Sequence, residues 1–293
     1  MSNPKTISLV LGSGGARGLA HIGVIQVLEE QGYEIKSIAG CSIGTVIGGI
    51  YAVGKLDLFE RWIRRLSRFD IIGMMDITWG RGGVIKGDKV IERLVEMAGD
   101  VNIQDLPIPF TAVAADIRNE KEVWINSGPL FDAIRASISL PLFLTPVKYK
   151  GSYLIDGGVL NPVPIAPTLH DDTDLTIAVN LGGPIEESPP VIDPQTQEEE
   201  SSFLNDMMTH LTEKWNALTN SSEKEEKDWG MYDVADQAFD AMQSTIARVK
   251  LAAYPPDLVI EIARNACGTM EFDRAEEMIA LGRKKAEAVL GEL

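Results

Sequence analysis

A serine between two glycines is the first candidate for chemistry in this chain of 293 residues. The segment Gly40-Cys41-Ser42-Ile43-Gly44 reads G-x-S-x-G and joins an apolar, β-rich run at 35–39 to an apolar helical pattern at 43–53. In that setting the pattern is typical of a nucleophile elbow, a sharp strand-to-helix turn that presents a serine hydroxyl. The helix N-terminus favours negative charge that develops beside the serine. A serine that only caps the helix is the alternative.

A second candidate is the glycine-rich segment GSGGARG at 12–18, which follows an apolar run at 7–11. A dinucleotide-binding loop requires G-x-G-x-x-G, and that spacing fails because the sixth residue from Gly12 is Arg17. Small residues allow successive backbone N–H groups to face an anion, so the segment suits an oxyanion hole, with Arg17 adding positive charge nearby. A tight turn without a ligand is the remaining interpretation.

A third candidate is Asp156, which heads the segment Asp156-Gly157-Gly158 after a predicted strand at 149–155. An aspartate at the carboxyl end of a strand, followed by two glycines, is placed to point into the same crevice as Ser42. D-G-G by itself is more often a turn than a catalytic site. The aspartate gains interest because a serine nucleophile needs a base.

The elements that must position these residues alternate along the chain. Short β-rich runs occur at 7–11, 35–39, 110–116, 149–155, 175–181 and 258–263. Helical patterns occur at 19–30, 43–53, 89–97, 130–139 and 272–290. This alternation predicts an α/β fold with three α/β/α layers and a mostly parallel central sheet.

Composition excludes several classes of protein. Hydrophobic residues make up 45% and charged residues 24%, as in ordinary globular proteins. The net charge of −16 disfavours a nucleic-acid partner. Residues 186–233 hold 13 acidic and 3 basic side chains, so much of this charge belongs to one proline-rich and acidic insertion, placed at about 183–230.

The sequence shows no clear pattern of a signal peptide, a membrane-spanning segment or a metal site. No signal peptide and no run of 18 apolar residues is visible, and two cysteines do not make a disulfide framework. We therefore expect a cytoplasmic protein. The histidines His21, His170 and His210 are scattered without ligand spacing, so we expect no metal site.

The segment 58–79 combines arginines with large apolar residues. Arg61, Arg64, Arg65 and Arg68 alternate with Phe59, Trp62, Ile63, Leu66 and Phe69. Such a basic amphipathic helix with an apolar loop after it suits a lid or a contact with a lipid surface. A surface helix that packs its apolar side on the core explains the same pattern.

Three blocks stand in a specific order: GSGGARGLAHIGV, AGCSIGTVIGGIYA, and RASISLPLFLTPV with YLIDGGVLNPVP after it. Together they resemble the patatin-like phospholipase family over about 5–185. The strand and helix within 255–293 also resemble short bacterial members related to neuropathy target esterase. The resemblance implies a single hydrolase domain over 1–293. Ser13 departs from the family pattern G-G-G-x-[KR]-G, in which a glycine stands at this position.

The resemblance also implies roles for residues. Ser42 is the expected nucleophile and Asp156 its base, in a Ser–Asp dyad without histidine. Gly14, Gly15 and Ala16 line the expected oxyanion hole, with Arg17 beside it.

The implied reaction is hydrolysis of fatty-acyl esters of phospholipids or lysophospholipids through an acyl-enzyme. No cofactor or metal is expected, and a peripheral contact with a membrane stays open. Two rivals stay open. A Ser–His–Asp esterase would join Ser42 and Asp156 to His170 or His210. A protein of the same fold could instead bind lipid without turnover.

Overall fold

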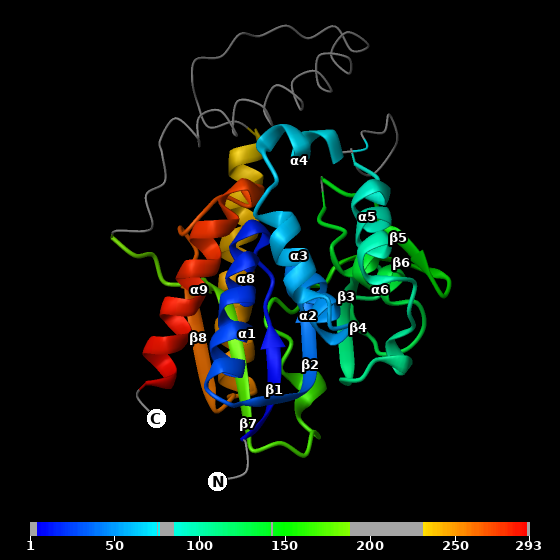
Figure 1. The fold of residues 1–293 in the computed structure, drawn as a ribbon. Coiled ribbons are helices and arrows are strands. Elements are labelled where there is room, and N and C mark those ends of the chain that lie inside the picture. Colours follow the sequence, from blue (N-terminus) through cyan, green and yellow to red (C-terminus); the bar gives the residue numbers. More distant parts are fainter. Residues whose placement is uncertain (1–4, 75, 77–84, 142, 188–230, 292–293) are drawn as a thin grey trace, which may run out of the picture.

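The computed structural model describes residues 5–74, 76, 85–141, 143–187 and 231–291 (Figure 1). The chain opens with β1 (Thr6–Leu11), the 3₁₀ turn η1 (Gly15–Leu19), α1 (Ala20–Glu30), β2 (Glu34–Cys41) and α2 (Ile43–Ala52). It continues with α3 (Leu56–Ile63), α4 (Arg68–Met74), α5 (Asp88–Ala98), β3 (Phe110–Asp116), β4 (Lys121–Ile125) and α6 (Leu130–Ser137). The later elements are β5 (Val147–Tyr149), β6 (Ser152–Asp156), η3 (Gly157–Val159), β7 (Leu175–Gly183), α8 (Met231–Ala253), β8 (Leu258–Ala263), η5 (Phe272–Arg274) and α9 (Ala275–Leu290).

The strands form one sheet in the order β5-β6-β3-β2-β1-β7-β8, with β4 also paired to β3. The five strands β3, β2, β1, β7 and β8 run parallel to one another, while β4 and β6 pair with β3 in the antiparallel direction. The prediction of a mostly parallel sheet between helices is confirmed. The parallel strands place the turns after β1 and β2 at one edge of the sheet.

Strand β1 shows why the sheet carries helices on both faces. Its side chains alternate, so Leu9 and Leu11 join the large core that includes α1, α2 and α9. Val10 faces the other side and packs with Ala178 of β7 and Ala247 of α8. Because both faces of β1 are buried, the run ISLVL is almost wholly apolar, as expected for a central parallel strand.

Three elements differ from the sequence-based expectations. The predicted strand at 149–155 is a hairpin of β5 and β6, because Lys150 (φ 44°) and Gly151 (φ 88°) adopt left-handed conformations that form its turn. Strand β4 and helix α8 were not predicted from the sequence. The body of the acidic insertion, 188–230, lies outside the described residues. In the described part, no helix has the length and apolar character needed to cross a membrane.

Candidate active site

Ser42 occupies a strained turn between β2 and α2. Its backbone has φ 55° and ψ −125°, which is rare for a residue with a side chain and is typical of a nucleophile elbow. The flanking glycines make this turn sterically possible. A Cβ on Gly44 would lie 2.1 Å from the Leu11 carbonyl oxygen, and one on Gly40 would lie 2.6 Å from the Gly44 oxygen. Strain of this kind costs about 1–3 kcal/mol and is found mainly at functional sites.

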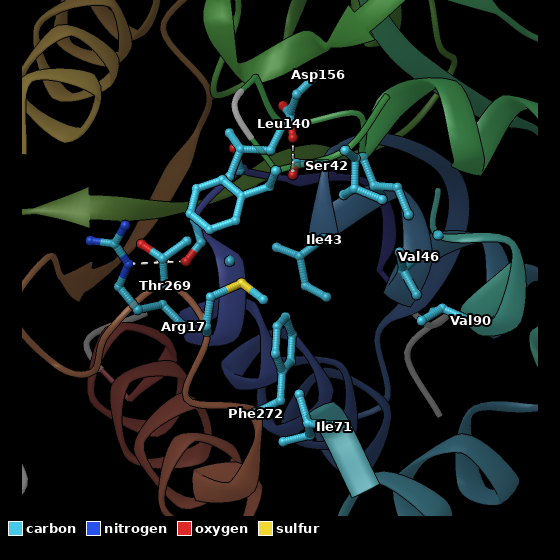
Figure 2. Close-up of a pocket in the computed structure, with 18 of the residues that line it drawn as sticks. Arg17, Ser42, Ile43, Val46, Ile71, Val90, Leu140, Asp156, Thr269 and Phe272 are labelled. Carbon is cyan, nitrogen blue, oxygen red and sulfur yellow. Dashed lines mark hydrogen bonds between the residues drawn. The ribbon is translucent and has the colours of Figure 1, made fainter. Parts of the chain in front are cut away.

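The Ser42 side chain contacts Asp156 directly. The hydroxyl Oγ donates a hydrogen bond to Asp156 Oδ2 at 2.5 Å, and Figure 2 shows the two groups facing each other at the cavity. The other carboxylate oxygen, Oδ1, accepts the backbone N–H of Gly158 at 2.7 Å. This bond, together with the pairing of the Asp156 N–H to the Ser139 carbonyl, fixes the carboxylate.

Burial brings the pKa of Asp156 closer to neutral pH than that of an ordinary aspartate. Only 1% of the residue is exposed, and this desolvation raises its pKa from 3.8 to about 6. The hydrogen bonds from Ser42 and Gly158 act in the opposite direction and limit the rise. A carboxylate with a pKa close to working pH accepts a proton more effectively than an ordinary exposed aspartate does.

The glycine turn after β1 contains both hydrogen-bonded and unbonded backbone N–H groups. The amides of Gly12, Ser13 and Ala16 donate to the carbonyls of Val179, Pro162 and Thr269, at 3.1, 2.8 and 2.9 Å. The amides of Gly14 and Gly15 have no acceptor among the described residues. Of the residues expected to form an oxyanion hole, Gly14 and Gly15 therefore have free donors, whereas the N–H of Ala16 is engaged.

The charge of Arg17 is not directed at the oxyanion site, as its place in the glycine turn had suggested. Its side chain is 4% exposed, and it donates to the Gly14 carbonyl, the Arg264 carbonyl and Asp240. Figure 2 shows it beside the cavity, apart from the Ser42–Asp156 pair. The guanidinium charge is thus balanced by a carboxylate of α8.

Ser137, at the end of α6, supports the elbow and was not among the predicted site residues. Its hydroxyl donates to the Val113 carbonyl at 2.6 Å and accepts the Ser42 backbone N–H at 2.9 Å. A hydroxyl has one proton, and Ser137 gives its proton to Val113. In the 2.8 Å contact between Ser137 Oγ and Thr45 Oγ1, Thr45 is therefore the donor. The only sequence signal for Ser137 was its place within the block RASISLP.

The histidines are placed as follows. His21 is fully buried on α1 with Nε2 2.9 Å from the Gly12 carbonyl, and desolvation lowers its pKa to about 4. His170 is exposed in the turn before β7, and His210 lies outside the described residues. Neither described histidine is hydrogen-bonded to Ser42 or Asp156. Within the described ranges, no group of three or more His, Cys, Asp or Glu side chains could hold a metal ion.

A cavity of about 210 Å³ opens beside Ser42 and Asp156 (Figure 2). Its lining is almost wholly apolar and comes from several elements, including Ile43 and Val46 of α2, Ile71 of α4 and Val90 of α5. Phe272 of η5 closes another side. An apolar cavity with a few polar side chains at its wall, Ser42 and Asp156 among them, suits an aliphatic chain whose reactive end reaches that pair.

The segment 58–79 is split into two helices in its described part. Helix α3 buries Phe59 and Ile63 in the core, as the surface-helix interpretation expects, and Trp62 and Leu66 line the cavity. Helix α4 has no buried residue. Residues 75 and 77–79 lie outside the described part.

Comparison with known proteins places the chain in a family. The family model described as patatin-like phospholipase matches residues 9–169. An NTE family protein of Mycobacterium bovis is 37% identical over 335 residues, covering 99% of this chain and 92% of that protein. A Cryptococcus neoformans protein named lysophospholipase NTE1 is 35% identical over 190 residues. That match covers 63% of this chain and 12% of the fungal protein.

The crystal structure of VipD from Legionella pneumophila is similar with a TM-score of 0.47 and 13% identity, covering 99% of this chain and 67% of that one. The family match spans β1 to the turn beyond Asp156, and so includes the glycine turn, the elbow and the aspartate. On the family model and the mycobacterial relative, this chain belongs to the patatin-like phospholipase family.

Proposed function

We propose that this protein hydrolyses fatty-acyl esters of phospholipids or lysophospholipids, with Ser42 as nucleophile and Asp156 as base. The observation that carries the proposal is the 2.5 Å contact between Ser42 Oγ and Asp156 Oδ2 at the wall of an apolar cavity. Family membership supports a lipid ester as substrate. The lysophospholipase names of the fungal relatives support the phospholipid or lysophospholipid class.

In the proposed reaction, Asp156 takes the Ser42 proton while the serine oxygen attacks the ester carbonyl carbon. The carbonyl oxygen becomes an oxyanion, which accepts hydrogen bonds from the free amides of Gly14 and Gly15. Collapse of the tetrahedral intermediate breaks the ester bond, and the leaving alcohol takes the proton from Asp156. Water then attacks the acyl-enzyme with Asp156 again as base, and collapse of the second intermediate releases the fatty acid while Asp156 returns the proton to the Ser42 oxygen.

A panel of esters tests this function. The wild type should hydrolyse lysophosphatidylcholine, diacyl phosphatidylcholine or a long-chain p-nitrophenyl ester, with measured release of fatty acid or nitrophenol. Ser42→Ala should abolish turnover and labelling by a fluorophosphonate, because the covalent step loses its nucleophile. Absence of hydrolysis by the wild type on the whole panel, or unchanged turnover in Ser42→Ala, would contradict the proposal.

Helix α4 is the proposed point of contact with a membrane. Ile71 and Met74 line the cavity, while Phe69 and Ile72 of the same helix are 85% and 39% exposed. One face of α4 thus lines the cavity beside Ser42, and the opposite face offers apolar side chains that can enter a lipid interface.

Sedimentation with phosphatidylcholine vesicles tests that contact. Phe69→Asp should reduce binding while hydrolysis of a soluble short-chain ester stays unchanged. The matched control is Tyr153→Asp, which alters an exposed aromatic residue on β6 rather than on α4. Equal binding by wild type and Phe69→Asp would contradict the placement on α4.

A further inference from the structure

Helix α8 brings two polar side chains, Asp240 and Gln243, to the glycine turn. They are three residues apart and therefore lie on one face of the helix. Both line the cavity beside Ser42, and Gln243 is only 7% exposed. Neither belongs to any of the sequence motifs that indicated the site, and α8 lies beyond the end of the family match at residue 169.

Asp240 holds Arg17 in a forked ion pair. Asp240 Oδ1 lies 2.8 Å from Arg17 Nη2, and Oδ2 lies 3.3 Å from Nη1. The Arg17 side chain is 4% exposed and that of Asp240 is 28% exposed. Loss of the carboxylate would remove this ion pair from a buried guanidinium, which is strongly unfavourable and would shift the arginine.

The position of Arg17 determines the direction of a catalytic donor. Arg17 Nε donates to the Gly14 carbonyl at 3.0 Å. The peptide unit between Gly14 and Gly15 is planar and trans, so its C=O and N–H point in opposite directions. An arginine that fixes the Gly14 carbonyl therefore also fixes the Gly15 N–H, one of the two free amides. Two successive glycines would otherwise leave this peptide free to rotate.

Gln243 holds the turn from a second point. Its Nε2 donates to Ser13 Oγ at 3.1 Å. The same pair lies over Gly158, since a Cβ there would be 2.3 Å from Gln243 Nε2 and 2.5 Å from Ser13 Oγ. The N–H of Gly158 donates to Asp156. Gln243 and Ser13 therefore join the glycine turn to the turn that carries the base, and the serine that departs from the family's glycine supplies the acceptor.

We propose that Asp240 and Gln243 are positioning residues that hold the Gly14–Gly15 peptide in the orientation needed to bind the oxyanion. The inference rests on the proposed function, because an oxyanion forms only if Ser42 attacks an acyl carbonyl. Asp240 acts through Arg17, and Gln243 acts through Ser13. Neither residue needs to contact the substrate.

The test compares four variants on one soluble ester, with folding checked by circular dichroism. Asp240→Asn keeps the size of the side chain and removes its charge, and Asp240→Glu restores the charge. Gln243→Leu removes the hydrogen bond to Ser13. The matched control is Glu30→Gln, which breaks another forked arginine pair, formed with Arg283 between α1 and α9.

The expected result is a loss in kcat with KM almost unchanged. Loss of one oxyanion donor costs about 10²–10³-fold, so a misoriented donor should cost about 10–100-fold in Asp240→Asn and Gln243→Leu. Asp240→Glu should recover much of the rate, and Glu30→Gln should match the wild type. A trifluoromethyl ketone, which forms a tetrahedral oxyanion on the serine, should bind more weakly in proportion to kcat/KM. A fatty alcohol of equal length should bind as before.

Several results would overturn the inference. Folded Asp240→Asn and Gln243→Leu with kcat within about twofold of the wild type would do so, because misdirected donors must slow the reaction. So would a variant that is less stable but has unchanged kcat per folded molecule. If Asp240→Asn does not fold, Gln243→Leu decides alone. A wild type without esterase activity would overturn both this inference and the proposed function, whereas an active wild type with active variants would overturn this inference only.

Discussion

Asp156→Asn should abolish activity and at the same time stabilise the folded protein. The amide is nearly the same size as the carboxyl but cannot accept the Ser42 proton. A catalytic base contributes about 10²–10⁴ in rate, so hydrolysis of a soluble ester should fall by that factor. Stability changes in the other direction, because the carboxylate of Asp156 is buried and its charge is unfavourable in the folded state.

The size of the stability effect follows from the pKa. Burial raises the pKa of Asp156 from 3.8 to about 6, so between these values the folded state binds more protons than the unfolded state. Wild-type stability therefore falls as the pH rises through this window, and Asp156→Asn lacks this loss. At about 1.4 kcal/mol per pKa unit, the variant should gain about 2–3 kcal/mol relative to wild type between about pH 4 and pH 8.

Urea unfolding at the two pH values measures this difference. Asp132→Asn, on the exposed side of α6, is the control for a change of net charge. The wild-type kcat/KM should rise with pH through about 6 and level off above it, as Asp156 loses its proton. A variant with more than a tenth of wild-type activity would refute Asp156 as the base. A stability difference between Asp156→Asn and the wild type that does not change with pH would contradict the raised pKa of Asp156.

Three further tests concern Ser137, Gly44 and the two histidines His170 and His210. Ser137→Ala removes the acceptor of the Ser42 N–H and the donor to Val113, so it should cost about 1–3 kcal/mol in urea unfolding and lower kcat. Unchanged stability and kcat would show that the elbow is held without it. Gly44→Ala places a methyl group 2.1 Å from the Leu11 oxygen and should destabilise by at least about 1–3 kcal/mol, whereas Gly73→Ala meets no atom within 4 Å and should not. His170→Ala and His210→Ala should each retain most esterase activity, and a thousandfold loss in either folded variant would favour a Ser–His–Asp triad.

Local sequence was enough to predict the turn between β2 and α2 and most of the sheet. The strands at 7–11 and 110–116 are mostly apolar on both faces, and this pattern depends on little beyond the neighbours that bury them. The turn at Ser42 is a property of a few consecutive residues. Gly40 and Gly44 are required there because the backbone approaches them too closely for a side chain.

The elements that were not predicted from the sequence are those that depend on contacts between distant residues. Strand β4 has a half-exposed pattern, with Trp124 48% exposed, so it shows no continuous apolar run. Among its described side chains, helix α8 buries a narrow stripe of Gln243, Ser244 and Ala247, and two of these three residues are polar. A helix of this kind does not show the apolar periodicity by which helices are predicted.

The amino-acid sequence by itself determined which residues can do chemistry here, namely a serine on a glycine elbow, a glycine turn and an aspartate before two glycines. Only the tertiary structure brought the aspartate to the serine. Strand β6 runs antiparallel to β3, so the rule for carboxyl ends of parallel strands does not place Asp156. The register does, because β3 pairs Val113 with Cys41 on one side and Ala114 with Asp156 on the other. Register depends on the pairing of whole strands, and no short motif encodes it.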